Sequence, residues 1–95
     1  MITTKTEDEA MMECYRRLYA NSTPSADFDK LFEEAELNEF GQKKIDFDSY
    51  EIEQELFEQI LDNIIKEYKI KYKWRQQAFK NTIILGASPR FKQKV

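Results

Sequence analysis

The apolar residues between positions 52 and 68 recur every three or four residues, and this spacing restricts the possible folds more than any other feature. Such a repeat places apolar side chains along one stripe of an α-helix. The residues concerned are Ile52, Leu56, Phe57, Ile60, Leu61, Ile64, Ile65 and Tyr68. The sequence also contains only 2 Gly and 2 Pro, which leaves few turn signals for a many-stranded sheet. We therefore expect an all-α fold.

The predicted start of this helix is a capping box. In Asp48-Ser49-Tyr50-Glu51 the first side chain can accept a hydrogen bond from the backbone of the fourth residue, whose own side chain can reach back. Phe47 before the cap and Ile52 after it have the spacing of a hydrophobic staple. The pattern predicts a helix over residues 49–68.

Two earlier segments show shorter helical patterns. Thr6-Glu7-Asp8-Glu9 is a second capping box, and the apolar residues after it predict a helix over residues 7–20. Thr23 has the chemistry of an N-cap, and Pro24 suits the first position of a helix. A further short helix is therefore expected over residues 24–36.

A fourth helix is expected over residues 72–85, because Gly86 and Pro89 form a C-terminal stop. The apolar residues of this helix that are expected to face a core are Trp74, Ala78, Phe79, Ile83 and Leu85. In particular, we expect Trp74 and Phe79 to pack against the third helix.

Together these segments predict a small bundle of three to four helices, over about 7–20, 24–36, 49–68 and 72–85. Residues 1–86 would form a single helical domain, and residues 87–95 a loose basic C-terminal tail. Lys44–Phe47 alternates as an extended linker would. The longest unbroken apolar run is Ile83–Leu85, so no membrane helix is expected.

Several chemistries lack the residues that they need. The sequence contains no histidine, the most common general base and metal ligand. Its only glycines, Gly41 and Gly86, stand 45 residues apart and cannot form a phosphate-binding loop. Cys14, the single cysteine, is expected to be inert and partly buried. We expect neither an enzyme nor a cofactor site, and the lack of a signal-peptide pattern favours a cytoplasmic protein.

One face of the third helix is acidic. Its carboxylates are Glu51, Glu55, Glu58 and Asp62. A di-iron site on such a face would need Glu-x-x-His repeats, and the chain has no histidine. Asp46–Glu51 begins like a calcium loop but lacks the required glycine at the sixth position and the glutamate at the twelfth. The acids are interpreted as a solvated face, and no metal site is expected.

Charge is divided unevenly along the chain. Residues 1–68 contain all 18 acidic residues and 7 basic ones, whereas residues 69–95 contain 8 basic residues and no acid. Such asymmetry is a hint of nucleic-acid binding. The candidate contacts to phosphate are Lys69, Lys71, Lys73, Arg75, Lys80 and Arg90. The neighbouring rings that could stack on unpaired bases are Tyr72, Trp74, Phe79 and Phe91.

A different interpretation is that the basic fourth helix packs on the acidic third helix of the same chain. The aromatic residues of the fourth helix also lie at core spacing. In addition, the net charge of −3 gives little long-range attraction to a polyanion. We favour this second interpretation, and with it a protein partner.

The apolar stripe of the third helix is also a candidate surface for self-association. The residues concerned are Phe57, Leu61, Ile64 and Tyr68. A chain of this size often completes its core with a second copy, which would give a homodimer. A closed monomer fits the pattern equally well, and both interpretations stay open.

Two stretches, YRRLYANSTPSADFD (residues 15–29) and RQQAFKNTIILGASPRF (residues 75–91), resemble small uncharacterised proteins carried by T4-like phages of marine bacteria. The resemblance implies an intracellular context of host infection, in the host cytoplasm, and supplies no catalytic or binding residues. The sequence therefore predicts a non-enzymatic accessory or protein-interaction module. Nucleic-acid binding through the basic C-terminal third is the alternative.

Overall fold

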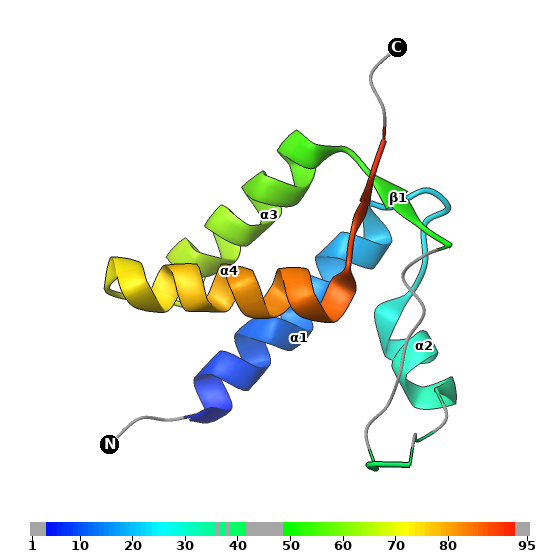
Figure 1. Ribbon diagram of the computed structural model, residues 1–95, viewed down its shortest axis with the longest axis horizontal. Helices are drawn as coiled ribbons and strands as arrows, with labels where there is room; N and C mark the ends of the chain where they lie inside the picture. The colour runs from blue at the N-terminus through cyan, green and yellow to red at the C-terminus, as the bar shows by residue number, and fades with distance from the viewer. Residues whose placement is uncertain (1–3, 36, 38, 42–48, 93–95) are drawn as a thin grey trace.

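The computed structural model describes residues 4–35, 37, 39–41 and 49–92, with side chains from residue 8 onward. The described residues form four helices, which are α1 (Thr4–Ala20), α2 (Phe28–Glu34), α3 (Gln54–Glu67) and α4 (Lys73–Ala87). Two short strands, β1 (Glu51–Ile52) and β2 (Arg90–Phe91), pair in parallel. The predicted all-α class and small helical bundle are confirmed (Figure 1).

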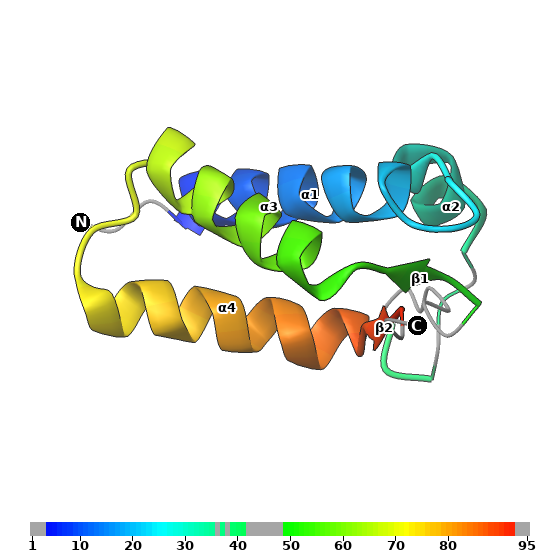
Figure 2. The same ribbon diagram turned by 90° about the horizontal axis from the view of Figure 1, so that it is seen from above.

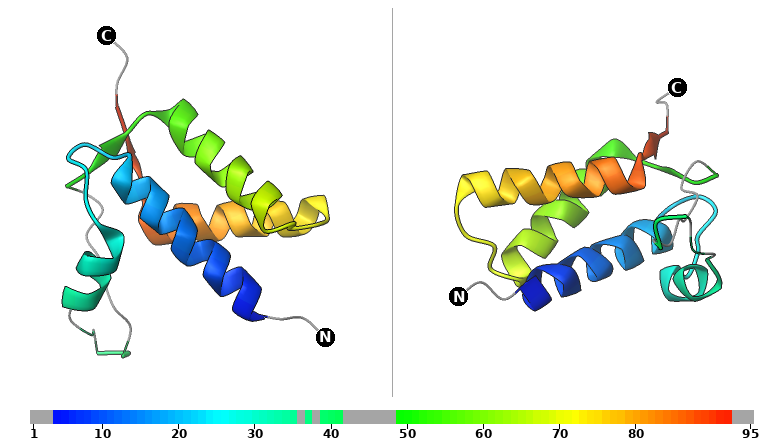
Figure 3. Two further views of the ribbon diagram at one scale, coloured as in Figure 1. Left: turned by 180° about the vertical axis from the view of Figure 1, so that it is seen from behind. Right: turned by 60° about the horizontal axis from the view of Figure 1, so that its bottom comes forward.

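The helices are arranged in a flat molecule of 38 × 38 × 19 Å. α1 and α3 lie side by side and run in opposite directions (Figure 1). α4 crosses the pair on one side, as the view from above shows (Figure 2). α2 lies beside the C-terminal end of α1, away from α4 (Figure 3). α1 and α3 therefore form one layer, and α4 forms a second.

The core lies where the three long helices meet. Each helix contributes residues at spacings of three or four, so that they form a ridge along one face. The buried residues of these helices include Ala10, Cys14 and Leu18 of α1, Phe57, Leu61 and Ile64 of α3, and Phe79, Ile83 and Ala87 of α4. The apolar stripe predicted between residues 52 and 68 is thus buried within the single chain, except for Leu56 and Tyr68, which are half-buried.

The predicted start of the third helix is wrong. α3 begins at Gln54 with Glu53 at the N-cap position, five residues later than expected. Upstream of it, the backbone of Glu51 donates to Thr23 at 3.0 Å and accepts from Thr23 at 2.7 Å. These two bonds hold Glu51 in an extended conformation that a helical residue could not adopt. The predicted capping residue Asp48 lies outside the described residues, as does the expected linker over residues 44–47.

The same pair of hydrogen bonds changes the start of the second helix. Thr23 faces Glu51 and is not an N-cap, and α2 begins only at Phe28. Its N-cap is Asp27, whose side chain accepts from the backbone N–H groups of Asp29 at 3.0 Å and Lys30 at 3.4 Å. The predicted helix over residues 24–36 is therefore shortened to seven residues.

The ends of the chain differ from prediction in smaller ways. α1 begins at Thr4, so Thr6 lies inside the first turn and is not a cap. Gly86 lies within α4, which ends at Ala87. The tail is not loose over residues 90–92, because β2 pairs with β1 and the Lys92 N–H donates to Ile52 O at 3.0 Å. Residues 93–95 lie outside the described part of the chain.

Among the described helices, none combines the length and the apolar character needed to cross a bilayer.

Candidate functional site

Trp74 does not belong to the core, contrary to the prediction, whereas Phe79 does. The side chain of Trp74 is 70% exposed, and that of Phe79 is 8% exposed. The reason is that the two side chains point in different directions around the axis of α4. Five residues separate the two side chains, which places them about 140° apart around the helix axis. The buried face of α4 is formed by Phe79, Ile83 and Ala87, and Trp74 lies outside it.

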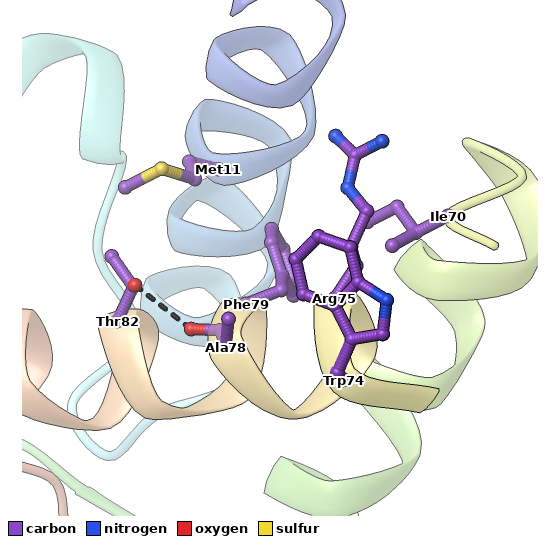
Figure 4. Close-up of a pocket in the computed structure, with 7 residues that line it drawn as sticks. All are labelled: Met11, Ile70, Trp74, Arg75, Ala78, Phe79 and Thr82. Atoms are coloured by element: carbon purple, nitrogen blue, oxygen red, sulfur yellow. Dashed lines mark hydrogen bonds between the residues drawn. The ribbon is translucent and has the colours of Figure 1, made fainter. Parts of the chain in front are cut away.

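Trp74 belongs instead to a row of side chains on the solvent side of α4. Its members, spaced by four, four and three residues, are Trp74, Ala78, Thr82 and Leu85, and we call them the α4 row. Leu85, another residue predicted to face the core, is 80% exposed. The Thr82 hydroxyl donates to the Ala78 carbonyl at 2.8 Å, so it is bonded within the helix (Figure 4). The α4 row is therefore uncharged, largely apolar and open to solvent.

A pocket of about 290 Å³ lies beside the α4 row (Figure 4). It is lined by Met11 of α1, by Ile70, and by Trp74, Arg75, Ala78, Phe79 and Thr82 of α4. The turn between α3 and α4 is tied to α4 by Gln76, whose side-chain amide donates to Ile70 O at 2.9 Å. The volume is at the lower end of the range for ligand pockets. Its lining is mainly apolar, with Arg75 and Thr82 as the polar side chains.

A second aromatic ring lies next to Trp74. Tyr72 is 66% exposed, and its ring is stacked on that of Trp74 with centroids 6.4 Å apart and planes at 19°. Tyr72 also has φ +69°, and Lys69, three residues earlier, has φ +52°. Side chains rarely adopt positive φ, since Cβ then meets the backbone. The turn that presents these rings is thus held in a strained conformation.

The six predicted phosphate contacts fall into three groups. Lys80 forms an ion pair with Asp62 of α3 at 3.1 Å, and Arg90 approaches Glu51 at 3.9 Å. Lys69, Lys71 and Lys73 are exposed and form no ion pair with any residue that the structure describes. Arg75 is half-buried beside the pocket. Lys71 and Lys73 are therefore exposed directly before and after Tyr72 in the sequence.

The other rings predicted to stack on bases are placed differently. Phe79 is buried, and Phe91 meets Phe57 edge-on with ring centroids 5.4 Å apart. Between basic α4 and acidic α3, Lys80–Asp62 is one ion pair of the expected sign.

The predicted self-association surface is covered by the chain itself. Phe57, Leu61 and Ile64 are at most 2% exposed, and Tyr68 is half-buried. A second copy could reach the first three only if the helices separated. The four residues of the predicted acidic face do not all lie on one helix. Glu51 lies in β1, and Glu55, Glu58 and Asp62 lie in α3. Within the described residues, no three metal-ligating side chains gather into a group.

Cys14 lies at the centre of α1 and is fully buried. Burial raises the pKa of its thiol to about 12, against a smaller opposing effect of Arg17. Arg17 in turn donates to both carboxylate oxygens of Glu67 on α3, each at 2.7 Å. The thiol therefore stays protonated at neutral pH, as expected for an inert cysteine.

No protein-family model, curated protein or solved structure was found to match this chain. The α4 row must therefore be interpreted from its own chemistry. The sequence contained a signal for it, because Trp74, Ala78 and Leu85 share one phase of a helix and Phe79 and Ile83 share another. The prediction assigned all five to the core, whereas the two phases face different surroundings.

Proposed function

We propose that the chain is a small non-enzymatic protein-interaction module, an accessory protein of the phage type that its sequence resembles. Its contact surface is the α4 row with the adjoining pocket. The observation that carries the proposal is the exposure of Trp74 and Leu85, at 70% and 80%, on one face of one helix. Exposed apolar patches mark interaction sites more often than chance, and tryptophan is the residue most enriched at binding hot spots.

The chemistry of the chain supports binding over catalysis. Histidine is missing from the sequence, and the one thiol is buried and protonated. A lone free cysteine is also usual for a protein of a reducing compartment, so a cytoplasmic site of action forms part of the proposal.

Photo-crosslinking tests the proposed function. A benzophenone side chain is introduced at Leu85 in the α4 row and, as a matched control, at the exposed Glu58 on α3. Irradiation of the cells that naturally produce the chain should give a discrete protein adduct from position 85 and little from position 58. The proposal is wrong if position 85 gives no protein adduct, or if both positions give the same adducts.

A second candidate function is binding of single-stranded nucleic acid. It is favoured by the stacked, exposed rings of Tyr72 and Trp74, which are flanked by Lys71 and Lys73. Stacking on aromatic rings together with cationic contacts to phosphate is the usual way to hold unpaired bases. The net charge of −3 opposes it at long range.

Fluorescence anisotropy with a labelled oligo(dT) tests this second candidate. Binding should weaken steeply as salt rises, because phosphate contacts release counterions. Changing Lys71 and Lys73 together to Ala should abolish it while the circular dichroism spectrum stays the same. Binding that is insensitive to salt, or unchanged in the double variant, rules the candidate out.

A further inference from the structure

We infer that the partner segment is an acidic amphipathic α-helix, which lies along the α4 row and places one apolar side chain in the pocket beside Trp74. This inference rests on the proposed function and specifies the chemistry of the partner.

The shape of the α4 row favours a helix. From Trp74 to Leu85 the row covers three turns, a length of about 16 Å. Ala78, at its second position, is small, so the row dips between the larger side chains at its two ends. Residues four apart on one helix form ridges that fit the grooves of another. Amphipathic helices bind such grooves through apolar residues at the same spacings.

The pocket supplies a socket for an anchoring side chain. Its apolar walls come from two helices and the turn between α3 and α4, with Met11 on the far side from Trp74 (Figure 4). Methionine is flexible and polarizable, which lets a wall adapt to side chains of different shape. Hot-spot residues characteristically fill pockets of this kind at the centre of an interface.

The charge of the residues around the α4 row determines the charge expected of the partner helix. Residues 69–92 contain seven basic residues and no acid. Lys69, Lys71 and Lys73 are exposed at one end of the row and make no ion pair within the described chain. Acidic side chains on a partner helix would complement them, whereas a second copy docked row to row would offer no acid from this segment.

Two synthetic peptides of about four helical turns test the inference. Both have Leu at positions i, i+3, i+4 and i+7, and the remaining positions are all Glu in one and all Lys in the other. Trp74 is the only tryptophan in the chain, so its emission reports directly on the row. The Glu peptide should shift the emission to shorter wavelength with an affinity that weakens as salt rises. The Lys peptide should have no effect.

Matched variants locate the binding site on α4. Leu85→Ala should weaken the affinity for the Glu peptide by about fivefold or more, as expected for a contact within a hot spot. Ile84→Ala removes an apolar side chain that is 44% exposed on the other flank of α4, and should leave the affinity unchanged. Equal weakening by the two substitutions would overturn the inference, because binding would then not be confined to the row.

Three other results would also overturn the inference. Equal binding of both peptides, or of neither, contradicts an acidic partner helix. A larger emission shift with oligo(dT) than with the Glu peptide assigns the surface to nucleic acid. A dimer seen by light scattering, with Trp74 emission already at short wavelength, assigns it to a second copy. If neither peptide binds but crosslinking from position 85 captures a protein, the proposed function stands and only the acidic helix is rejected.

Discussion

The α1–α3 pair and α4 use their apolar residues differently. Where α1 meets α3, Leu18 and Ile64 are fully buried on opposite sides of the contact. Arg17 and Glu67 join the same two helices through a pair of parallel hydrogen bonds at the edge. The apolar stripes of both helices are thus covered within the chain.

On α4 the apolar residues are divided between the core and the solvent. Phe79 and Ile83 are buried, whereas Trp74 and Leu85 are among the most exposed large apolar side chains of the described chain. A helix needs one apolar face to join a bundle. α4 has that face and an additional apolar row, so the row is not required for folding. The proposed function rests on this surplus.

The largest expected effect is a difference in folding stability between a substitution in the α1–α3 contact and one in the α4 row. Ile64→Ala should lower the free energy of unfolding by about 2–5 kcal/mol, because it leaves a cavity between α1 and α3. Leu85→Ala should change it by no more than about 0.5 kcal/mol, since the side chain is already in water. Urea denaturation followed by circular dichroism measures both. A cost for Leu85→Ala close to that of Ile64→Ala would mean that the α4 row is part of a core.

This contrast also shows which parts of the fold could be predicted from sequence. The repeat between residues 52 and 68 predicted α3 because a long periodic segment determines both the element and its buried face. The repeat in α4 is ambiguous. Trp74 and Phe79 are both large aromatic residues, and only the packing of α4 against segments distant in sequence decides which of them is covered.

The helix starts could not be predicted for a related reason. Thr23 and Asp27 are both good N-cap residues, and local sequence does not choose between them. The choice is made by the hydrogen bonds between Thr23 and Glu51, which lie 28 residues apart. The same contact delays the start of α3. Local propensity is therefore overruled by a pairing between distant segments.

The second prediction concerns the contact that joins α4 to α1. A Cβ added at Gly86 would collide with the hydroxyl of Tyr15, whose ring is stacked on Phe28 with centroids 5.4 Å apart. Gly86→Ala should therefore cost about 1–3 kcal/mol, the usual range for overpacking. The cost should disappear in a Tyr15→Phe background, where the ring carbon Cζ would lie at an acceptable 3.4 Å from the new methyl group.

The double variant, Gly86→Ala with Tyr15→Phe, gives a stricter test. Without the clash, alanine is preferred to glycine inside a helix by up to about 1 kcal/mol, so the sign of the effect should reverse. Thermal or urea unfolding of the four proteins in the cycle measures the coupling. An additive result would show that α4 does not approach α1 at Tyr15.

The third prediction is a gain of stability in the strained turn before α4. Tyr72 has φ +69°, and such a conformation costs a side chain about 1–3 kcal/mol. Glycine adopts it freely but loses about 0.5–1 kcal/mol of conformational entropy on folding. Tyr72→Gly should therefore leave stability unchanged or raise it by up to about 2 kcal/mol, as measured by thermal unfolding.

Lys69→Gly is the matched variant, because Lys69 also has positive φ but carries no ring. Both substitutions should relieve strain, and only Tyr72→Gly removes the partner of the Trp74 stack. If nucleic acid binds here, Tyr72→Gly should lose affinity for oligo(dT) while it gains stability. A clear loss of stability in Tyr72→Gly would show that stacking on Trp74 outweighs the backbone strain.

The smallest expected effect is at the edge of the α1–α3 pair. The guanidinium of Arg17 holds the pKa of Glu67 below its ordinary value, chiefly through their hydrogen bonds. A carboxyl whose pKa is lowered by folding stabilises the folded state above its unfolded pKa, and this contribution is lost as the pH falls through the folded value. Glu67→Gln should thus be slightly less stable than the parent at neutral pH, and the difference should vanish in acid. High salt should also reduce it, because both side chains are partly exposed. Unfolding curves at several pH values measure the difference, with Glu58→Gln as the control on the exposed face of α3. A difference that persists unchanged into acid would mean that Glu67 stabilises the α1–α3 contact by packing and not by charge.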